Sequence, residues 1–203
     1  GKTSVLEAIT YLATANSPYT TSDRQLIHWL TEDDPIPFAR ISAELNNKES
    51  QYQKLDITLM VDNTGASTRF KKNIQHNNVD KRVMDVVGLL NVVLFVPQDL
   101  SLIEGSPSDR RRFMNTTLKQ VDVDYLIALT EYDKLLPQRN ALLKRIADKR
   151  SSPAELEFWD EQLANNGSVI IAGRQRFLRE LEVKAQDMHY TLTGGRETLT
   201  LKY

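Results

Sequence analysis

The first three residues, Gly1, Lys2 and Thr3, combine the groups that proteins use to hold phosphate. They match the last three positions of the loop G-x-x-x-x-G-K-[ST]. In that loop backbone N–H groups cradle phosphate, the lysine reaches the β- and γ-phosphates, and the hydroxyl binds Mg²⁺. Gly1 to Ser4 are therefore the candidate ATP-binding residues, and Thr3 is the candidate Mg²⁺ ligand. The tripeptide is short, and an ordinary helix start is the alternative.

The position of this tripeptide favours phosphate binding. Apolar residues follow it at helical spacing, which predicts an amphipathic helix over 4–14 that opens at the tripeptide. Lys2 then lies in the first helical turn, where a cation opposes the helix dipole by about 0.3–1 kcal/mol unless an anion is nearby. A bound phosphate would supply that anion.

Three consecutive arginines, Arg110, Arg111 and Arg112, form a second candidate site for phosphate or DNA. Ser106 as N-cap, Pro107 at the first position and Asp109 in a capping box predict that a helix begins just before them. At about 100° per residue the three side chains fan over more than half the helix circumference, so they cannot all serve one ligand. Solvated arginines and ion pairs are the alternative.

Two further segments could contact ligands. Gln98 and Asp99 follow the apolar run 91–96, and a loop after a strand is a place where α/β folds put ligand-contacting groups. Gln98 is thus a further candidate for ATP or metal contact, with a capped loop as the alternative. The stretch 135–145 is basic and apolar by turns, and it fits either a partner-binding helix or an amphipathic helix with a solvated basic face.

The elements around these residues can be predicted from periodicity. We expect a loop with one short helix over 16–37, then an antiparallel meander from 38 to 72 whose clearest strand alternates at Leu55, Ile57, Leu59 and Val61. A short helix is predicted at 83–90 and a strand buried on both faces at 91–96. Helices follow at 107–120, 122–148 and 154–192, the last one bent or interrupted at Gly167 and Gly173. Alternation at 198–203 predicts a final strand.

Composition sets limits on the class of protein. The chain has 203 residues, a formal net charge of −1 and no cysteine, so a nucleic-acid contact must come from a local basic patch and a disulfide framework is excluded. The three histidines lack metal-ligand spacing. No apolar run approaches the roughly 20 residues of a membrane helix. We expect a soluble cytoplasmic protein with no membrane partner, and a natural start that precedes Gly1.

Four blocks of the sequence, taken in order, resemble the RecF family. These blocks are GKTSVLEAI at 1–9, LNVVLFVPQDLSLIEGSPSDRRRFMN at 90–115, QRNALLK at 138–144 and WDEQLANNG at 159–167. RecF is a bacterial DNA replication and repair protein with an ATPase head like those of ABC and SMC-type proteins. The resemblance implies an α/β P-loop head, here partial, with a helical lobe inserted into it. The implied domains are a partial ATPase lobe at 1–106, a helical arm at 107–193 and a strand at 194–203 that returns to the ATPase lobe.

The same resemblance implies a function. ATP with Mg²⁺ would drive homodimerisation on DNA at junctions of single and double strands, and RecR and RecO would be partners in loading recombinase at gaps. The implied context is DNA repair, recombination, replication and the SOS response. Weak DNA-dependent ATPase activity is expected of a full-length protein but not of residues 1–203, since the acidic Walker B residues would lie beyond Tyr203.

Some residues depart from the family pattern. Gln98 stands where many relatives have Glu, Asn115 where Asp is common, and Pro137 where a basic residue is usual. Two other functions stay open. A P-loop kinase of small molecules would need an acceptor pocket and a lid, and an SMC-like interaction protein would bind partners without ATP turnover.

Overall fold

The computed structural model describes residues 1–31, 34–46, 52–65 and 67–203, apart from the side chains of Gln98 and Ser101. The chain divides into two compact units, 1–100 and 101–203. Each unit has a hydrophobic core of its own. The predicted assignment of 1–106, 107–193 and 194–203 to lobes stays a prediction.

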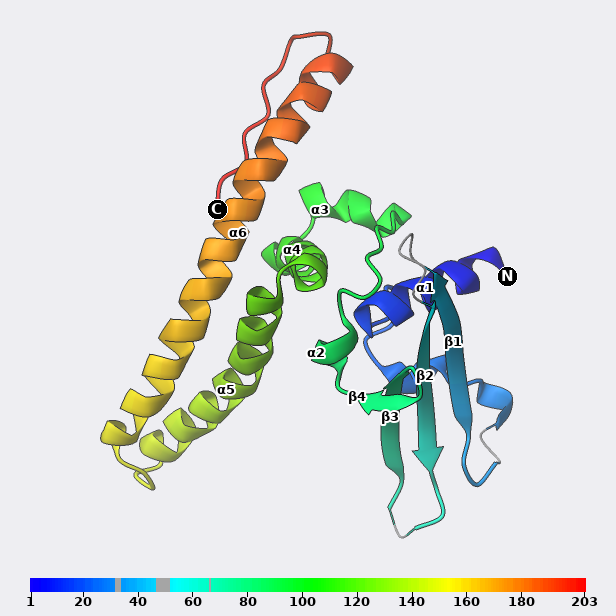
Figure 1. Ribbon diagram of the computed structural model, residues 1–203. Coiled ribbons are helices and arrows are strands. Elements are labelled where there is room, and N and C mark those ends of the chain that lie inside the picture. The colour runs from blue at the N-terminus through cyan, green and yellow to red at the C-terminus, as the bar shows by residue number, and fades with distance from the viewer. Residues whose placement is uncertain (32–33, 47–51, 66) are drawn as a thin grey trace. The chain divides into compact units, whose positions relative to one another are not determined.

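The first unit is a helix packed on an antiparallel sheet (Figure 1). Helix α1 spans Lys2–Thr14, and the short 3₁₀ helices η1 and η2 span Asp23–Leu26 and Trp29–Thr31. The four strands lie in sequence order, with every neighbouring pair antiparallel. Their bounds are Phe38–Asn46 for β1, Tyr52–Asp62 for β2, Arg69–His76 for β3 and Val79–Lys81 for β4. The predicted meander is confirmed.

Alternation along β2 builds the core of this unit. Leu55, Ile57, Leu59 and Val61 are all buried, because successive side chains on a strand point to opposite faces. The first three of these pack with Tyr11 and Leu12 of α1, so one face of the sheet carries the helix. Only the last part of α1 joins this core: Leu12 is buried, as its place in the helical pattern predicts, whereas Val5, Leu6 and Ile9 are exposed.

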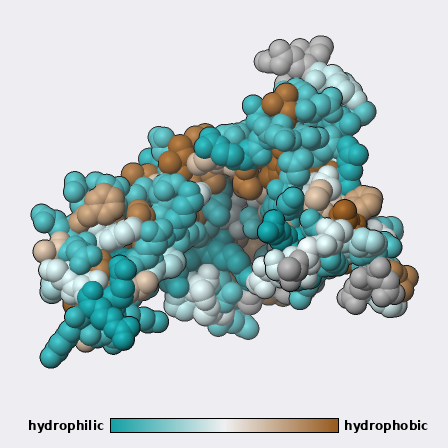
Figure 2. Space-filling view, turned by 90° about the horizontal axis from the view of Figure 1, so that it is seen from below, coloured by the Kyte–Doolittle hydropathy of each residue, from teal (hydrophilic) through white to brown (hydrophobic). Residues whose placement is uncertain are grey.

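The segment after the sheet corrects one prediction. Helix α2 spans Val83–Val86, and the 3₁₀ helix η3 spans Pro97–Leu100. Residues 91–96 between them form no strand, and Val93 and Phe95 are exposed. A strand needs a neighbour to pair its backbone groups, and no strand of the described chain runs beside this segment. Figure 2 shows hydrophobic side chains lying among hydrophilic ones on the face that it draws.

The second unit is helical. Helix α3 spans Ser101–Glu104, α4 Pro107–Val121, α5 Val123–Ala147 and α6 Leu156–Leu192, with the 3₁₀ helix η4 at Pro153–Glu155. Helices α5 and α6 pack side by side as a hairpin (Figure 1). The three long helices were predicted within a few residues. Helix α6 runs unbroken through 37 residues, about 55 Å at 1.5 Å per residue.

Two details of this unit differ from expectation. Gly167 and Gly173 do not interrupt α6, because they face tyrosine rings of α5 and leave room for them. Residues 198–203 form no strand. They run back along α6, where the backbone N–H of Leu201 donates to the Glu182 carboxylate at 3.1 Å and Arg174 donates to the Tyr203 hydroxyl. Alternation alone does not make a strand without a partner strand.

Candidate phosphate and nucleic-acid sites

The N-terminus of α1 presents the predicted phosphate-binding residues to solvent. Gly1 is the N-cap, the helix begins at Lys2, and residues 1–4 are exposed. The first turn holds no acidic residue, and Lys2 forms no ion pair with any residue that the structure describes. The first N–H groups of a helix have no partner within the helix, and they carry its positive dipole end.

These groups fit a nucleotide phosphate chemically. Free backbone N–H groups, one ammonium and the hydroxyls of Thr3 and Ser4 form a set that donates to oxyanions. A side chain at Gly1 would meet no atom of the described residues within 4 Å. The hydroxyl of Thr3 is of the type that binds Mg²⁺ in such loops.

The opposite end of α1 is held firmly. Lys72 donates from its ammonium to the Ala15 carbonyl oxygen and pairs with Asp23 at 2.9 Å, while it lies 4.8 Å above the ring of Tyr11. Burial raises the pKa of the Tyr11 hydroxyl, and the neighbouring Asp23 carboxylate adds to the shift. The phenol is therefore neutral at physiological pH, and the buried end of α1 fixes the direction in which the exposed end projects.

In the loop after residue 96, the structure describes the side chain of Asp99 but not that of Gln98. Asp99 accepts a hydrogen bond from the Val96 N–H at 2.8 Å, and its own N–H donates to the Val96 carbonyl. Asp99 thus caps its own loop, which is the alternative considered from sequence. The side chain of Gln98 lies outside the described part of the chain, so its contact with ATP or metal stays a prediction.

The three arginines of α4 have three different environments. Asp109 forms the predicted capping box with Ser106, whose hydrogen bonds lower the pKa of that carboxyl. Arg110 donates to the Gly105 carbonyl at 3.0 Å, and Arg112 lies 3.5 Å from Asp109. Arg111 instead lines a pocket together with Asn115 and residues of α5, α6 and the C-terminal segment. Their different environments match the fan predicted from helical geometry.

Sequence reasoning missed the buried Arg174 on α6. Its guanidinium donates to the Tyr125 hydroxyl at 3.1 Å, to the Tyr203 hydroxyl at 3.2 Å and to Asn115 Oδ1 at 3.0 Å. Burial raises the pKa of Tyr125, although Arg174 opposes that shift. The sequence does contain one indication of burial. Ile170 lies four residues before Arg174 and Phe177 three residues after it, so all three share one helical face.

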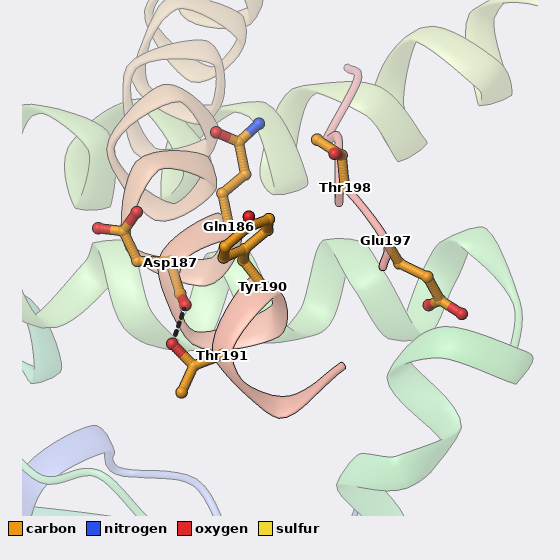
Figure 3. Close-up of a pocket in the computed structure, with 6 residues that line it drawn as sticks. All are labelled: Gln186, Asp187, Tyr190, Thr191, Glu197 and Thr198. Atoms are coloured by element: carbon orange, nitrogen blue, oxygen red, sulfur yellow. Dashed lines mark hydrogen bonds between the residues drawn. The ribbon is translucent and has the colours of Figure 1, made fainter. Parts of the chain in front are cut away.

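A second pocket lies at the end of α6 and is unlike a phosphate site. It measures about 440 Å³ between the last turns of the helix and the returning segment (Figure 3). Its lining residues are Gln186, Asp187, Tyr190, Thr191, Glu197 and Thr198. Two carboxylates and no cation line it, so it would repel a phosphate.

The described residues contain neither a cluster of metal-ligating side chains nor a membrane-spanning helix. No group of three or more His, Cys, Asp or Glu side chains in this part of the chain could hold a metal ion. None of its helices is both long and apolar enough to cross a bilayer.

Comparison with solved structures identifies the class of protein. A structure of the recombination mediator protein RecF-ATP in the RecFOR pathway aligns with 96% of this chain and 49% of its own, with a TM-score of 0.81 and 26% identity. A RecF-ATPrS structure aligns with a TM-score of 0.76, also at 26% identity, over 95% of this chain and 49% of that one. The mixed helix and sheet content and this match define an α/β protein with the ABC ATPase fold.

Sequence comparison identifies the particular relatives. The DNA replication and repair protein RecF of Chloroflexus aurantiacus is 38% identical over 212 residues, which cover 100% of this chain and 54% of that protein. RecF of Thermomicrobium roseum is 39% identical over 207 residues, covering 100% and 52%. No family model matches the chain. The chain is similar to RecF proteins over its whole length, and it spans about half the length of the curated relatives it matches.

Proposed function

We propose that this chain supplies part of the ATP-binding head of a RecF-like protein that acts on DNA in repair, recombination and replication. One observation carries the proposal: Lys2 and Thr3 are exposed at the start of α1, Lys2 forms no ion pair among the described residues, and the fold matches RecF-ATP. The relatives' names point to DNA replication and repair. The proposed place of action is the cytoplasm.

The proposed roles follow from the chemistry of each residue. The backbone N–H groups of Gly1 to Ser4 hold phosphate oxygens, Lys2 neutralises charge on the β- and γ-phosphates, and the Thr3 hydroxyl is a ligand of Mg²⁺. The bound Mg²⁺ would neutralise phosphate charge. Gln98 is proposed to contact the nucleotide or its metal. In this role ATP acts as a switch for assembly, and its hydrolysis transforms no metabolite.

The proposed partners are DNA, a second copy of the protein, RecR and RecO. The RecFOR pathway named for a similar structure supports the last two. Arg110, Arg111 and Arg112 are the proposed DNA-contacting residues, since arginine pairs well with phosphate. The helical arm at 107–193 is proposed to be inserted within the ATPase lobe, with 194–203 returning to it.

The two other functions are less well supported. A small-molecule kinase would need an acceptor pocket near α1, but the chain continues from α1 into an antiparallel sheet and later a long helical hairpin. An SMC-like protein without ATP turnover would not require Lys2 and Thr3. Both RecF relatives and RecF-ATP structures favour the ATP-dependent alternative.

The test uses a full-length RecF-like protein that contains this chain, with and without Lys2→Ala. We expect the variant to bind ATP about tenfold or more weakly, because a charge-assisted contact to phosphate is lost. ATP-dependent dimerisation in sedimentation and ATP-dependent binding to gapped DNA should fall with it. Lys184→Ala, an exposed lysine of α6, is the matched control. If DNA binding is the same with and without ATP, and the same with and without Lys2→Ala, ATP does not act as the proposed switch.

A further inference from the structure

A pocket within the helical unit brings two arginines together from different helices. It measures about 390 Å³ and is lined by α4, α5, α6 and the last residue of the chain. Its polar lining residues are Arg111, Asn115, Tyr132, Asp133, Arg174 and Tyr203, and its apolar ones are Leu129, Ile170 and Ile171. Gly167 completes the wall. All of these residues belong to one compact unit.

Arg174 is a buried charge whose hydrogen-bond partners are neutral. Only 9% of the residue is exposed, and its guanidinium donates to two tyrosine hydroxyls and one amide oxygen. Among the described residues no carboxylate lies within ion-pairing distance of it. A guanidinium has five N–H donors and is always charged. Three single hydrogen bonds therefore leave some of its N–H groups available and do not neutralise its charge. A buried charge without a counter-ion is costly.

The charges of the lining leave room for one anion. Among the lining side chains, Arg111 and Arg174 contribute two positive charges and Asp133 contributes one negative charge. The resulting charge of +1 is balanced by one singly charged oxyanion. A phosphodiester carries one negative charge, and guanidinium N–H groups match its oxygens well.

The surroundings of Arg111 favour the phosphate of a polynucleotide. Arg110 and Arg112 flank it on the exposed first turns of α4, and their partners in the structure are a carbonyl and a partly solvated carboxylate. Such contacts are weak and can be exchanged for phosphate. If one phosphate of a DNA strand enters the pocket, Arg110 and Arg112 can therefore pair with the neighbouring phosphates.

We propose that Arg111 and Arg174 form a seat for one backbone phosphate of DNA, with the Tyr203 hydroxyl beside it. This proposal rests on the proposed function for the identity of the ligand as DNA. It assigns the three arginines of α4 unequal roles, with Arg111 inside the seat and its neighbours outside it. It also gives a ligand-binding role to Arg174, which lies 63 residues further along the chain.

The decisive variant is Asn115→Asp. It places a carboxylate where an amide oxygen now lies 3.0 Å from Arg174, so it supplies an internal counter-ion and should preserve the fold. Arg111→Gln removes the second cation. Arg179→Gln, an exposed arginine of α6, is the matched control that changes net charge outside the pocket.

Two measurements are made on the full chain without nucleotide. Inorganic phosphate, compared with chloride at equal ionic strength, should raise the unfolding temperature of the unaltered chain and of Arg179→Gln, but not of Asn115→Asp or Arg111→Gln. Fluorescence anisotropy with a single-stranded oligonucleotide should show binding about tenfold weaker for Asn115→Asp and Arg111→Gln. The slope of log affinity against log salt should also fall by about 1 for Arg111→Gln.

Each other outcome overturns the proposal. If Asn115→Asp leaves both measurements unchanged, no anion occupies the pocket. If it abolishes the effect of inorganic phosphate but not oligonucleotide binding, the occupant is a free phosphate compound and the DNA assignment is wrong. If only binding of a polyglutamate peptide depends on it, the occupant is an acidic protein segment. Because no nucleotide is present, these results are independent of Lys2 and of the ATP-dependent switch.

Discussion

Gly173 shows how one residue can decide the packing of two long helices. A Cβ atom at this position would lie 2.7 Å from Cδ2 of Tyr125, whose ring is fully buried. The ring cannot turn aside freely, since its hydroxyl bonds to Asn115 and Arg174. Glycine is therefore present for close approach of α5 and α6, and not to bend the helix.

We predict that Gly173→Ala destabilises the helical unit although alanine is the better helix former. Overpacking costs about 1–3 kcal/mol, against a helix-propensity gain of about 1 kcal/mol. Gly167→Ala is the control, because its Cβ would lie at an ordinary 3.6 Å from Tyr132 and only the gain applies. Urea unfolding should show Gly173→Ala at least about 1 kcal/mol less stable than Gly167→Ala. Equal stability would contradict the role given to Gly173.

At the scale of elements, a buried carboxylate joins β1 to β2. Asp56 of β2 is 3% exposed, and it accepts hydrogen bonds from Arg40 and Ser42 of β1, with Lys54 at 3.5 Å. Burial alone would raise its pKa, but the Ser42 hydroxyl and the two cations outweigh burial and lower it. A carboxyl whose pKa is lowered by folding stabilises the fold only while it is ionised.

This pairing predicts a pH-dependent effect of Asp56→Asn. At pH 7 the variant should be less stable by about 1–3 kcal/mol, the range for a hydrogen bond to a charged group. The difference should shrink as the pH falls below about 3.9, the unfolded value, and through the lowered folded pKa. Urea unfolding at pH 7 and at pH 3 measures it, with the exposed Asp34→Asn as control. A difference that persists unchanged at low pH would exclude this role for the carboxylate.

Across the whole molecule, the two cores share no residue. The first joins α1, the sheet, α2 and Leu90, and the second joins α4, α5 and α6. A unit with its own core can fold as an independent piece. The division falls between Leu100 and Ser101.

We therefore predict that residues 101–203 fold when they are expressed alone. Far-UV circular dichroism should show a helical protein that unfolds cooperatively in urea. Leu118→Ala, a truncation of a buried side chain of α4, should lower its stability by about 2–5 kcal/mol. A non-cooperative transition, or one insensitive to this truncation, would show that the second core depends on the first unit.

The sequence by itself determined the features that depend on local spacing. Helical periodicity located α1, α4, α5 and α6, alternation located β2, and Ser106 with Asp109 located the start of α4. Four blocks in order identified the RecF resemblance, which the comparisons confirm. Each of these signals comes from neighbouring residues or from their order along the chain.

Only the tertiary structure decided what depends on partners distant in sequence. An apolar run at 91–96 and alternation at 198–203 both predict strands, but strands form only beside a strand that accepts their hydrogen bonds. The glycines of α6 predict a bend, but in the structure the helix is unbroken and tyrosine rings of α5 lie against these glycines. No local motif marks Arg174, because its partners lie on α4, on α5 and at residue 203. Its charge becomes buried only when these distant segments pack together.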